Sequence, residues 1–193
     1  MTGVRIVGIG GTLRAGSTSE QVLRYAVNVA AELGADTELI VATELDLPMY
    51  SPGIRQPERA LKMLDAIRRA DGVIVSSPGY HGGISGLLKN ALDYLEELSG
   101  DPRPYLHGKA VGCIVASAGW QAGATSLTSL RSTVHALRGW PTPLGAVVNS
   151  TVKPFDLQGN LTDPKTRDQL GTVGRQVVEF AQAQLLTATH RRP

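Results

Sequence analysis

The chain has 193 residues, of which 42% are hydrophobic and 19% are charged, and its formal net charge is +2. This composition is typical of a globular protein with a substantial core, so we predict a single domain over residues 1–193. The small charge argues against a nucleic-acid partner, and no apolar run approaches the roughly 18 residues that a membrane span needs. The N-terminus has no signal-peptide pattern, and the single cysteine, Cys113, lies in an apolar run. We therefore expect a cytoplasmic protein whose one thiol is inert and forms no intrachain disulfide.

Short apolar runs alternate with longer amphipathic segments along the chain. The apolar runs predict strands over residues 4–10, 37–41, 72–77, 110–116 and 146–149. The amphipathic segments predict helices over residues 17–33, 57–70, 85–98, 123–137 and 164–187. Ser17 and Glu20 have the spacing of a capping box, and Gly34 is expected to end the first helix. Five buried strands interleaved with five helices predict an α/β fold, with a parallel sheet between two layers of helices.

Ligands of such sheets bind beyond the carboxyl ends of the strands. Three loops of unusual composition are predicted there, at residues 10–19, 78–83 and 117–123. The first loop follows a strand and leads into a helix, and a helix N-terminus with its free N–H groups favours anions.

Two common glycine-rich motifs do not fit the first loop. Leu13 stands where the dinucleotide-binding fingerprint has its third glycine, and Ser17 stands where a P-loop has its lysine. What remains is a loop that offers hydroxyls and one guanidinium to a small dianion, from Thr12, Arg14, Ser17, Thr18 and Ser19. The alternative is a solvated turn in which Ser17 only caps its helix.

Two stretches carry a resemblance to a known family. Residues 11–19, GTLRAGSTS, resemble the phosphate loop of the NADPH-dependent FMN reductase family in the flavodoxin-like superfamily. Residues 77–94, SPGYHGGISGLLKNALDY, are similar almost position for position to a second signature of that family. The turn at residues 156–161 also resembles the one that often precedes the last helix of its members. Gly79 and His81 depart from the pattern, because the family commonly has glutamate and asparagine there.

The resemblance implies a flavodoxin-like three-layer sandwich with a five-stranded parallel sheet. It also implies an FMN-dependent NAD(P)H oxidoreductase, which transfers a hydride from NADPH or NADH to the flavin. Electrons would then pass to free FMN, a quinone, an azo compound or a metal oxyanion, and free FMN could supply a flavin-dependent monooxygenase as partner. The flavin carries this chemistry, so no catalytic side chain is expected. A non-enzymatic carrier of the flavodoxin type is the alternative function.

The resemblance also implies which residues contact the cofactor. The first loop would hold the phosphate, and the other two loops would border the ring, through Pro78, Gly79, Tyr80, His81, Gly82, Gly83, Ser117 and Gly119. The glycines of the second loop would let the backbone approach a flat ring and direct N–H groups at its carbonyl edge. Tyr80 has the alternative of anchoring the next helix, and His81 that of facing solvent. Trp120 is expected either to shield the ring or to lie in a subunit contact.

The helix predicted over residues 85–98 is apolar over more than one face, with Leu88, Leu92 and Leu95 among its apolar positions. Members of the resembled family use this helix in subunit packing, so a homodimer or homotetramer is expected. Lys89 and Asp93 are four residues apart and are predicted to form a structural ion pair.

Other chemistries find no support in the sequence. The four histidines are widely spaced and lack paired cysteines or an H-E-x-x-H arrangement, so no metal site is predicted. A G-x-S-x-G nucleophile elbow is also absent.

Overall fold

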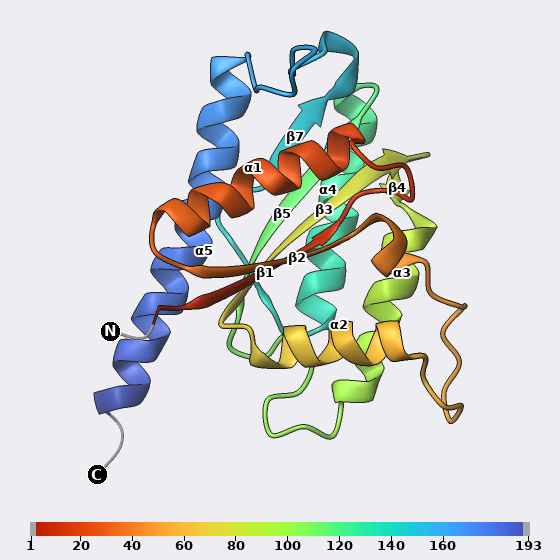
Figure 1. Ribbon diagram of the computed structural model, residues 1–193, viewed down its shortest axis with the longest axis vertical. Coiled ribbons are helices and arrows are strands. Elements are labelled where there is room, and N and C mark those ends of the chain that lie inside the picture. The colour runs from red at the N-terminus through yellow and green to blue at the C-terminus, as the bar shows by residue number, and fades with distance from the viewer. Residues whose placement is uncertain (1–2, 191–193) are drawn as a thin grey trace.

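The computed structural model describes residues 3–190, and their side chains as far as residue 187. A parallel sheet runs through the centre of the molecule, and helices cover both of its faces (Figure 1). The sheet is built from β1 (Arg5–Gly10), β2 (Asp36–Val41), β3 (Gly72–Tyr80), β5 (Ala110–Ser117) and β7 (Ala146–Asn149). All of the predicted strands are present.

The order of these parallel strands across the sheet is β2-β1-β3-β5-β7. In chain order this is 2-1-3-4-5, the order of flavodoxin-like folds. The predicted fold class is therefore confirmed. Two short strands that the sequence did not predict complete the sheet. β4 (Gly83–Ile84) pairs antiparallel with the end of β3, and β6 (Trp140–Pro141) pairs with the start of β5.

The helices follow the predicted segments closely. They are α1 (Thr18–Glu32), α2 (Glu58–Arg69), α3 (Gly86–Asp93), α4 (Trp120–Ala136) and α5 (Pro164–His190). Ser17 caps α1 and Gly34 follows its end with a φ of +86°, as predicted. The helix expected over residues 85–98 is divided, because α3 ends at Asp93 and a 3-10 helix, η2 (Tyr94–Leu98), continues it. Two further 3-10 helices are η1 (Ala42–Leu45) and η3 (Ser150–Val152).

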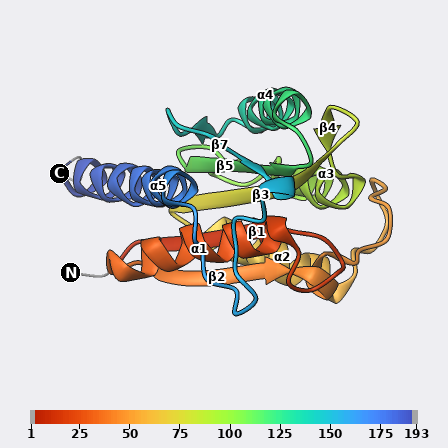
Figure 2. The same ribbon diagram turned by 90° about the horizontal axis from the view of Figure 1, so that it is seen from above.

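Two apolar cores lie on the opposite faces of the sheet. One is formed with α1 and α5, and the other with α2, α3, η2 and α4. α5 is the longest helix, and its C-terminal part extends beyond the sheet (Figures 1 and 2). Among the residues that the structure describes, no helix has the length and apolar character to cross a bilayer.

The leucines of α3 and η2 belong to the core, which corrects the expectation that they form a subunit contact. Leu88, Leu92 and Leu95 are all buried within the second core. The exposed face of this segment carries charged residues instead, among them Glu96 and the ion-paired Lys89 and Asp93. The predicted Lys89–Asp93 pair is thus present, on the surface of α3.

Candidate functional site

The loop between β1 and α1 leaves the sheet at a very close backbone contact. Gly10 has a φ of +144°, and a Cβ at this position would lie 1.9 Å from the carbonyl oxygen of Ser76 in β3. The N–H of Gly11 donates to that same oxygen at 3.1 Å. The hydroxyl of Ser76 in turn donates to the Ser19 carbonyl at 2.7 Å. The loop is therefore fixed to Ser76, in the middle of β3, at its beginning and at its return into α1.

The first turn of α1 presents donors that no described residue accepts from. Over residues 3–190, the backbone N–H groups of Ser17, Thr18 and Ser19 have no hydrogen-bond acceptor. The guanidinium of Arg14, which is exposed on the same loop, likewise has no hydrogen bond or ion pair within the described part of the chain. Thr12 holds the Arg14 backbone through its hydroxyl, which accepts from Arg14 N at 3.1 Å and donates to Arg14 O at 3.0 Å. Three amides, hydroxyls and one guanidinium together form a donor set that suits a phosphate.

The predicted capping box is only half formed. The Ser17 hydroxyl accepts from Glu20 N at 3.4 Å, as expected. The Glu20 carboxylate does not return to the Ser17 amide; it accepts from Gly16 N at 3.0 Å and pairs with Arg24 at 2.8 Å. A carboxylate therefore lies behind this loop, bonded to Gly16 through one oxygen and to Arg24 through the other.

The second predicted loop, residues 78–83, is a β-hairpin rather than an irregular loop. β3 continues to Tyr80, and His81 and Gly82 form a two-residue turn before β4, with φ values of +51° and +80°. Two successive positive φ angles are typical of a type I′ turn, which explains why a permissive residue is needed at Gly82. The Ser126 hydroxyl of α4 donates to the Gly83 carbonyl at 3.0 Å and holds the hairpin against that helix.

Gly79 packs closely against the neighbouring elements. A Cβ at this position would lie 3.0 Å from both the Ser117 Cβ and the Ser126 Oγ. The small residue at 79 thus leaves room for β5 and α4 at this end of the sheet. The glutamate common at this position in the resembled family would need its neighbours here to move.

The third loop follows β5 and begins α4. Ser117 is buried, and its hydroxyl donates to the Gly119 carbonyl at 2.7 Å, which closes the loop tightly. Trp120, the first residue of α4, has 60% of its surface exposed.

These loops enclose a cavity of about 220 Å³ at the carboxyl ends of β1, β3, β5 and β7. It brings together nine of the predicted residues, namely Thr12, Arg14, Ser17, Thr18, Ser19, Pro78, Gly79, Tyr80 and Ser117. Four predicted residues lie outside its lining: His81, Gly82 and Gly83 at the hairpin, and Gly119 in the third loop. A smaller cavity of about 170 Å³ adjoins it, shares Thr12 and Tyr80, and is bordered by Leu13 and Leu87.

The cavity also has lining residues that the sequence did not indicate. Ala116 and Ala118 flank Ser117, and Ser150 comes from the segment after β7. Asn149 fixes that segment, because its side-chain oxygen accepts from both the N–H and the hydroxyl of Thr151, at 3.0 and 2.8 Å. The available signal was that Ser150 directly follows the predicted strand over residues 146–149, whose carboxyl end lies at the same edge of the sheet.

The remaining polar residues of the second signature support a neighbouring loop. Asn90 donates to the carbonyls of Leu47 and Pro48, at 3.2 and 2.9 Å, and accepts from Tyr50 N at 2.8 Å. Tyr94 donates to Pro48 O at 2.9 Å. Partial burial and a hydrogen bond to Glu97 raise the pKa of Tyr50 to about 12. These residues thus hold residues 47–50 against α3 and do not line the cavity.

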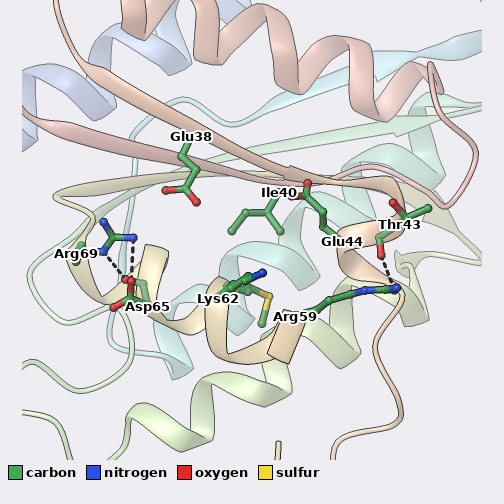
Figure 3. Close-up of a pocket in the computed structure, with 9 residues that line it drawn as sticks. Glu38, Ile40, Thr43, Glu44, Arg59, Lys62, Asp65 and Arg69 are labelled. Atoms are coloured by element: carbon green, nitrogen blue, oxygen red, sulfur yellow. Dashed lines mark hydrogen bonds and ion pairs between the residues drawn. The ribbon is translucent and has the colours of Figure 1, made fainter. Parts of the chain in front are cut away.

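A larger hollow of about 390 Å³ lies elsewhere, between β2 and α2 (Figure 3). Its charged side chains are mostly satisfied by one another or by the backbone. Asp65 pairs with Arg69 at 2.9 Å, and Arg59 donates to the Thr43 carbonyl at 3.2 Å (Figure 3). We call this hollow the β2–α2 groove. Its internal pairing distinguishes it from the cavity at the strand ends.

No cluster of metal ligands is present in the described part of the chain. Three or more His, Cys, Asp or Glu side chains do not come together anywhere within it.

Comparison with known proteins finds relatives that match most of the chain. The family model of NADPH-dependent FMN reductases matches residues 4–153. An NAD(P)H-dependent FMN reductase of Pseudomonas aeruginosa is 31% identical over 169 residues, which cover 86% of this chain and 88% of the relative. A quinone reductase of Escherichia coli is also 31% identical, over 176 residues that cover 86% and 89% of the two chains.

A solved structure also has the same fold. FerB of Paracoccus denitrificans, a flavoenzyme NAD(P)H:(acceptor) oxidoreductase, has a TM-score of 0.76 at 22% identity, with 94% of this chain and 98% of that chain covered. The two relatives above are enzymes, which favours the predicted oxidoreductase over a non-enzymatic carrier. The predicted function, an FMN-dependent NAD(P)H oxidoreductase with FMN and NAD(P)H as cofactor and substrate, is confirmed. The chain belongs to the NADPH-dependent FMN reductase family.

Proposed function

We propose that FMN binds in the cavity at the carboxyl ends of β1, β3, β5 and β7. Its phosphate would lie at the first turn of α1, and its ring beside Pro78–Tyr80 and Ser117. The observation that carries this proposal is that, among the described residues, the N–H groups of Ser17, Thr18 and Ser19 and the guanidinium of Arg14 beside them have no partner. These donors fit a phosphate, because a helix N-terminus and a charged side chain both favour a dianion.

The protein groups would bind and orient the cofactor and take no part in bond making. FMN, when bound, supplies the centre that accepts a hydride from NADPH or NADH and passes electrons on. The fixed attachment of the loop to Ser76 would hold the phosphate donors in place before the ligand arrives. The hairpin, held on α4 by Ser126, would keep the backbone of residues 79 and 80 at the ring.

We further propose that Tyr80 borders the position that nicotinamide and the electron acceptor occupy in turn. Its side chain is 54% exposed and lines both the cavity and the smaller one beside it. Leu13, 51% exposed, also lines the smaller cavity and would provide an apolar contact for a planar acceptor. The relatives, an FMN reductase and a quinone reductase, support free flavin or a quinone as that acceptor.

An anaerobic rapid-mixing experiment tests the function directly. Protein loaded with FMN is mixed with NADPH or NADH, without a partner protein, and the absorbance of oxidised flavin is followed. Loss of that absorbance within seconds is expected, and addition of a quinone or of free FMN should restore it. Flavin that stays oxidised under excess NADPH and NADH would contradict the proposed reaction.

The predicted assembly as a homodimer or homotetramer stays a proposal, on a different surface from the α3–η2 leucines. The outward positions of α4 are uncharged over two turns, at Ala124, Thr125 and Thr128. Thr128→Glu should shift the protein toward monomer in light scattering, whereas Glu96→Gln on η2 should not. A wild type that is monomeric at micromolar concentration would exclude this assembly.

We also propose a cytoplasmic location, which the use of NAD(P)H supports.

A further inference from the structure

A buried carboxylate lies directly behind the loop that we assign to the phosphate. The Glu20 side chain is only 5% exposed, and its Oε2 accepts from Gly16 N at 3.0 Å. It packs against Gly11, where an added Cβ would come within 3.3 Å of the Glu20 Cβ. Glu20 is not among the residues that line the cavity, so its charge would act on a ligand through the loop.

This carboxylate has two opposite effects. Its hydrogen bond fixes Gly16 and so the conformation of the loop that precedes the unused donors. Its negative charge, however, lies in the first turn of α1, at the helix end that attracts an anion. A phosphate dianion on the other side of the loop would be repelled unless this charge were neutralised, because the repulsion is poorly screened by solvent at a buried group.

Arg24 supplies the neutralising charge. Its Nε and Nη2 both lie 2.8 Å from Oε1 of Glu20, while Oε2 is left for Gly16. The guanidinium is half exposed and follows Glu20 by one helical turn. It binds Oε1 of the carboxylate, whereas Gly16 binds Oε2. Each oxygen of the carboxylate thus has a separate partner, one for loop conformation and one for charge.

We propose that Glu20 and Arg24 form a positioning pair, in which Glu20 fixes the loop and Arg24 cancels the charge that would otherwise weaken phosphate binding. The inference rests on the proposed site of the FMN phosphate. It predicts that Arg24 raises the affinity for FMN without touching it, and that this contribution exists only while Glu20 is charged.

A double-mutant cycle tests this prediction, with the dissociation constants of FMN and riboflavin measured by quenching of flavin fluorescence. Arg24→Gln should lower FMN affinity by about five- to tenfold at low ionic strength and leave riboflavin affinity unchanged. Adding Glu20→Gln to that variant should restore FMN affinity to within about twofold of wild type, since the amide oxygen still accepts from Gly16 N. Arg24→Lys, which keeps the charge, should bind FMN almost as well as wild type.

The loss in Arg24→Gln should shrink as salt is added, because screening weakens a charge effect but not a purely structural one. Lys62→Gln is the matched control, since Lys62 and Glu58 form an i,i+4 pair of the same 2.8 Å length on α2, away from the cavity. Circular dichroism and thermal unfolding show whether each variant is folded.

Two results would overturn the proposal. If Arg24→Gln binds FMN as well as Lys62→Gln does, Arg24 has no role in phosphate binding. If the loss in Arg24→Gln persists in the double variant, Arg24 contacts the phosphate directly or acts on the fold. A wild type that binds FMN no more tightly than riboflavin would instead contradict the proposed phosphate site itself, and so the failure of each idea is distinguishable.

Discussion

The cavity at the strand ends and the β2–α2 groove are both solvent-accessible and both lined by polar side chains, but they differ in how their groups are paired. In the groove, Asp65 already pairs with Arg69, and Arg59 already donates to the backbone (Figure 3). In the cavity, by contrast, Arg14 and the first amides of α1 have no acceptor within the described residues. The groove is the larger of the two, at about 390 Å³ against about 220 Å³. Unused donors, and not volume, therefore distinguish the proposed binding site from the groove.

The loop that borders the cavity also depends on a close backbone contact at Gly10. Among the substitutions considered, Gly10→Ala is expected to have the largest effect on stability. A Cβ at residue 10 would lie 1.9 Å from the Ser76 carbonyl, at a φ that side chains rarely adopt. We expect a loss of about 3 kcal/mol or more in the free energy of unfolding, measured by urea denaturation. Gly100→Ala is the control, because a Cβ there meets nothing within 4 Å. Equal stabilities of the two variants would show that the tight contact is not required.

Removal of the unused guanidinium should have the next largest effect, on binding and not on folding. Arg14→Ala should weaken FMN binding by about tenfold to a hundredfold, the value of a charge-assisted hydrogen bond. Riboflavin, which lacks the phosphate, should bind equally well to the variant and to wild type. Arg59→Ala removes a guanidinium of the β2–α2 groove and should leave FMN affinity unchanged. A loss of FMN affinity in Arg59→Ala as great as in Arg14→Ala would remove the distinction between the two regions.

A smaller effect, and a gain, is expected at the hairpin. His81 has a φ of +51° in the first position of its two-residue turn, where asparagine is preferred. His81→Asn should therefore raise the free energy of unfolding by about 0.5 kcal/mol. His107→Asn is the control, because His107 is exposed and does not have a positive φ, so the same substitution relieves no strain there. A decrease in stability for His81→Asn would mean that the imidazole makes a contact worth more than the relief of strain.

The smallest effect is expected in the groove. Asp65→Asn removes the partner of Arg69, but both side chains are about half exposed. Exposed ion pairs contribute little, so the free energy of unfolding should change by less than about 0.5 kcal/mol and FMN affinity not at all. A larger change in thermal unfolding would assign the groove a structural role that its exposure does not indicate.

The sequence predicted the five parallel strands and five helices because each has a strong local signal. Apolar runs marked the strands, and Ser17 and Gly34 marked the ends of α1. β4 and β6 were missed because each has only two residues, and its strand character comes from pairing with β3 or β5. The glycine-rich composition of residues 78–83 is also typical of an irregular loop. The hairpin becomes evident only from the pairing of β3 with β4.

The candidate site could be predicted where one local segment supplies several residues. The first loop, residues 10–19, was predicted from its composition and its place between a strand and a helix, and five of its residues line the cavity. Ser150 was not, because it is far away in the chain and reaches the cavity only through the pairing of β7 with β5. A capping box was predicted from the spacing of Ser17 and Glu20, but the carboxylate accepts from Gly16 N through Oε2 and pairs with Arg24 through Oε1, and neither partner follows from that spacing. Burial of Leu88, Leu92 and Leu95 likewise depends on how α3 and η2 pack, which their apolar pattern left open.

The position of Cys113 provides a built-in reporter of how often the core on one face of the sheet opens. The thiol is fully buried in β5, opposite Val75 of β3, and burial raises its pKa to about 12. At neutral pH it is therefore protonated and out of reach of thiol reagents, and it is the only cysteine of the chain. Its labelling rate would measure the fraction of time that the core between the sheet and α2, α3 and α4 is open around β5. Because β5 ends at Ser117 in the cavity, saturation with FMN should slow that labelling and report ligand binding as a change in local opening.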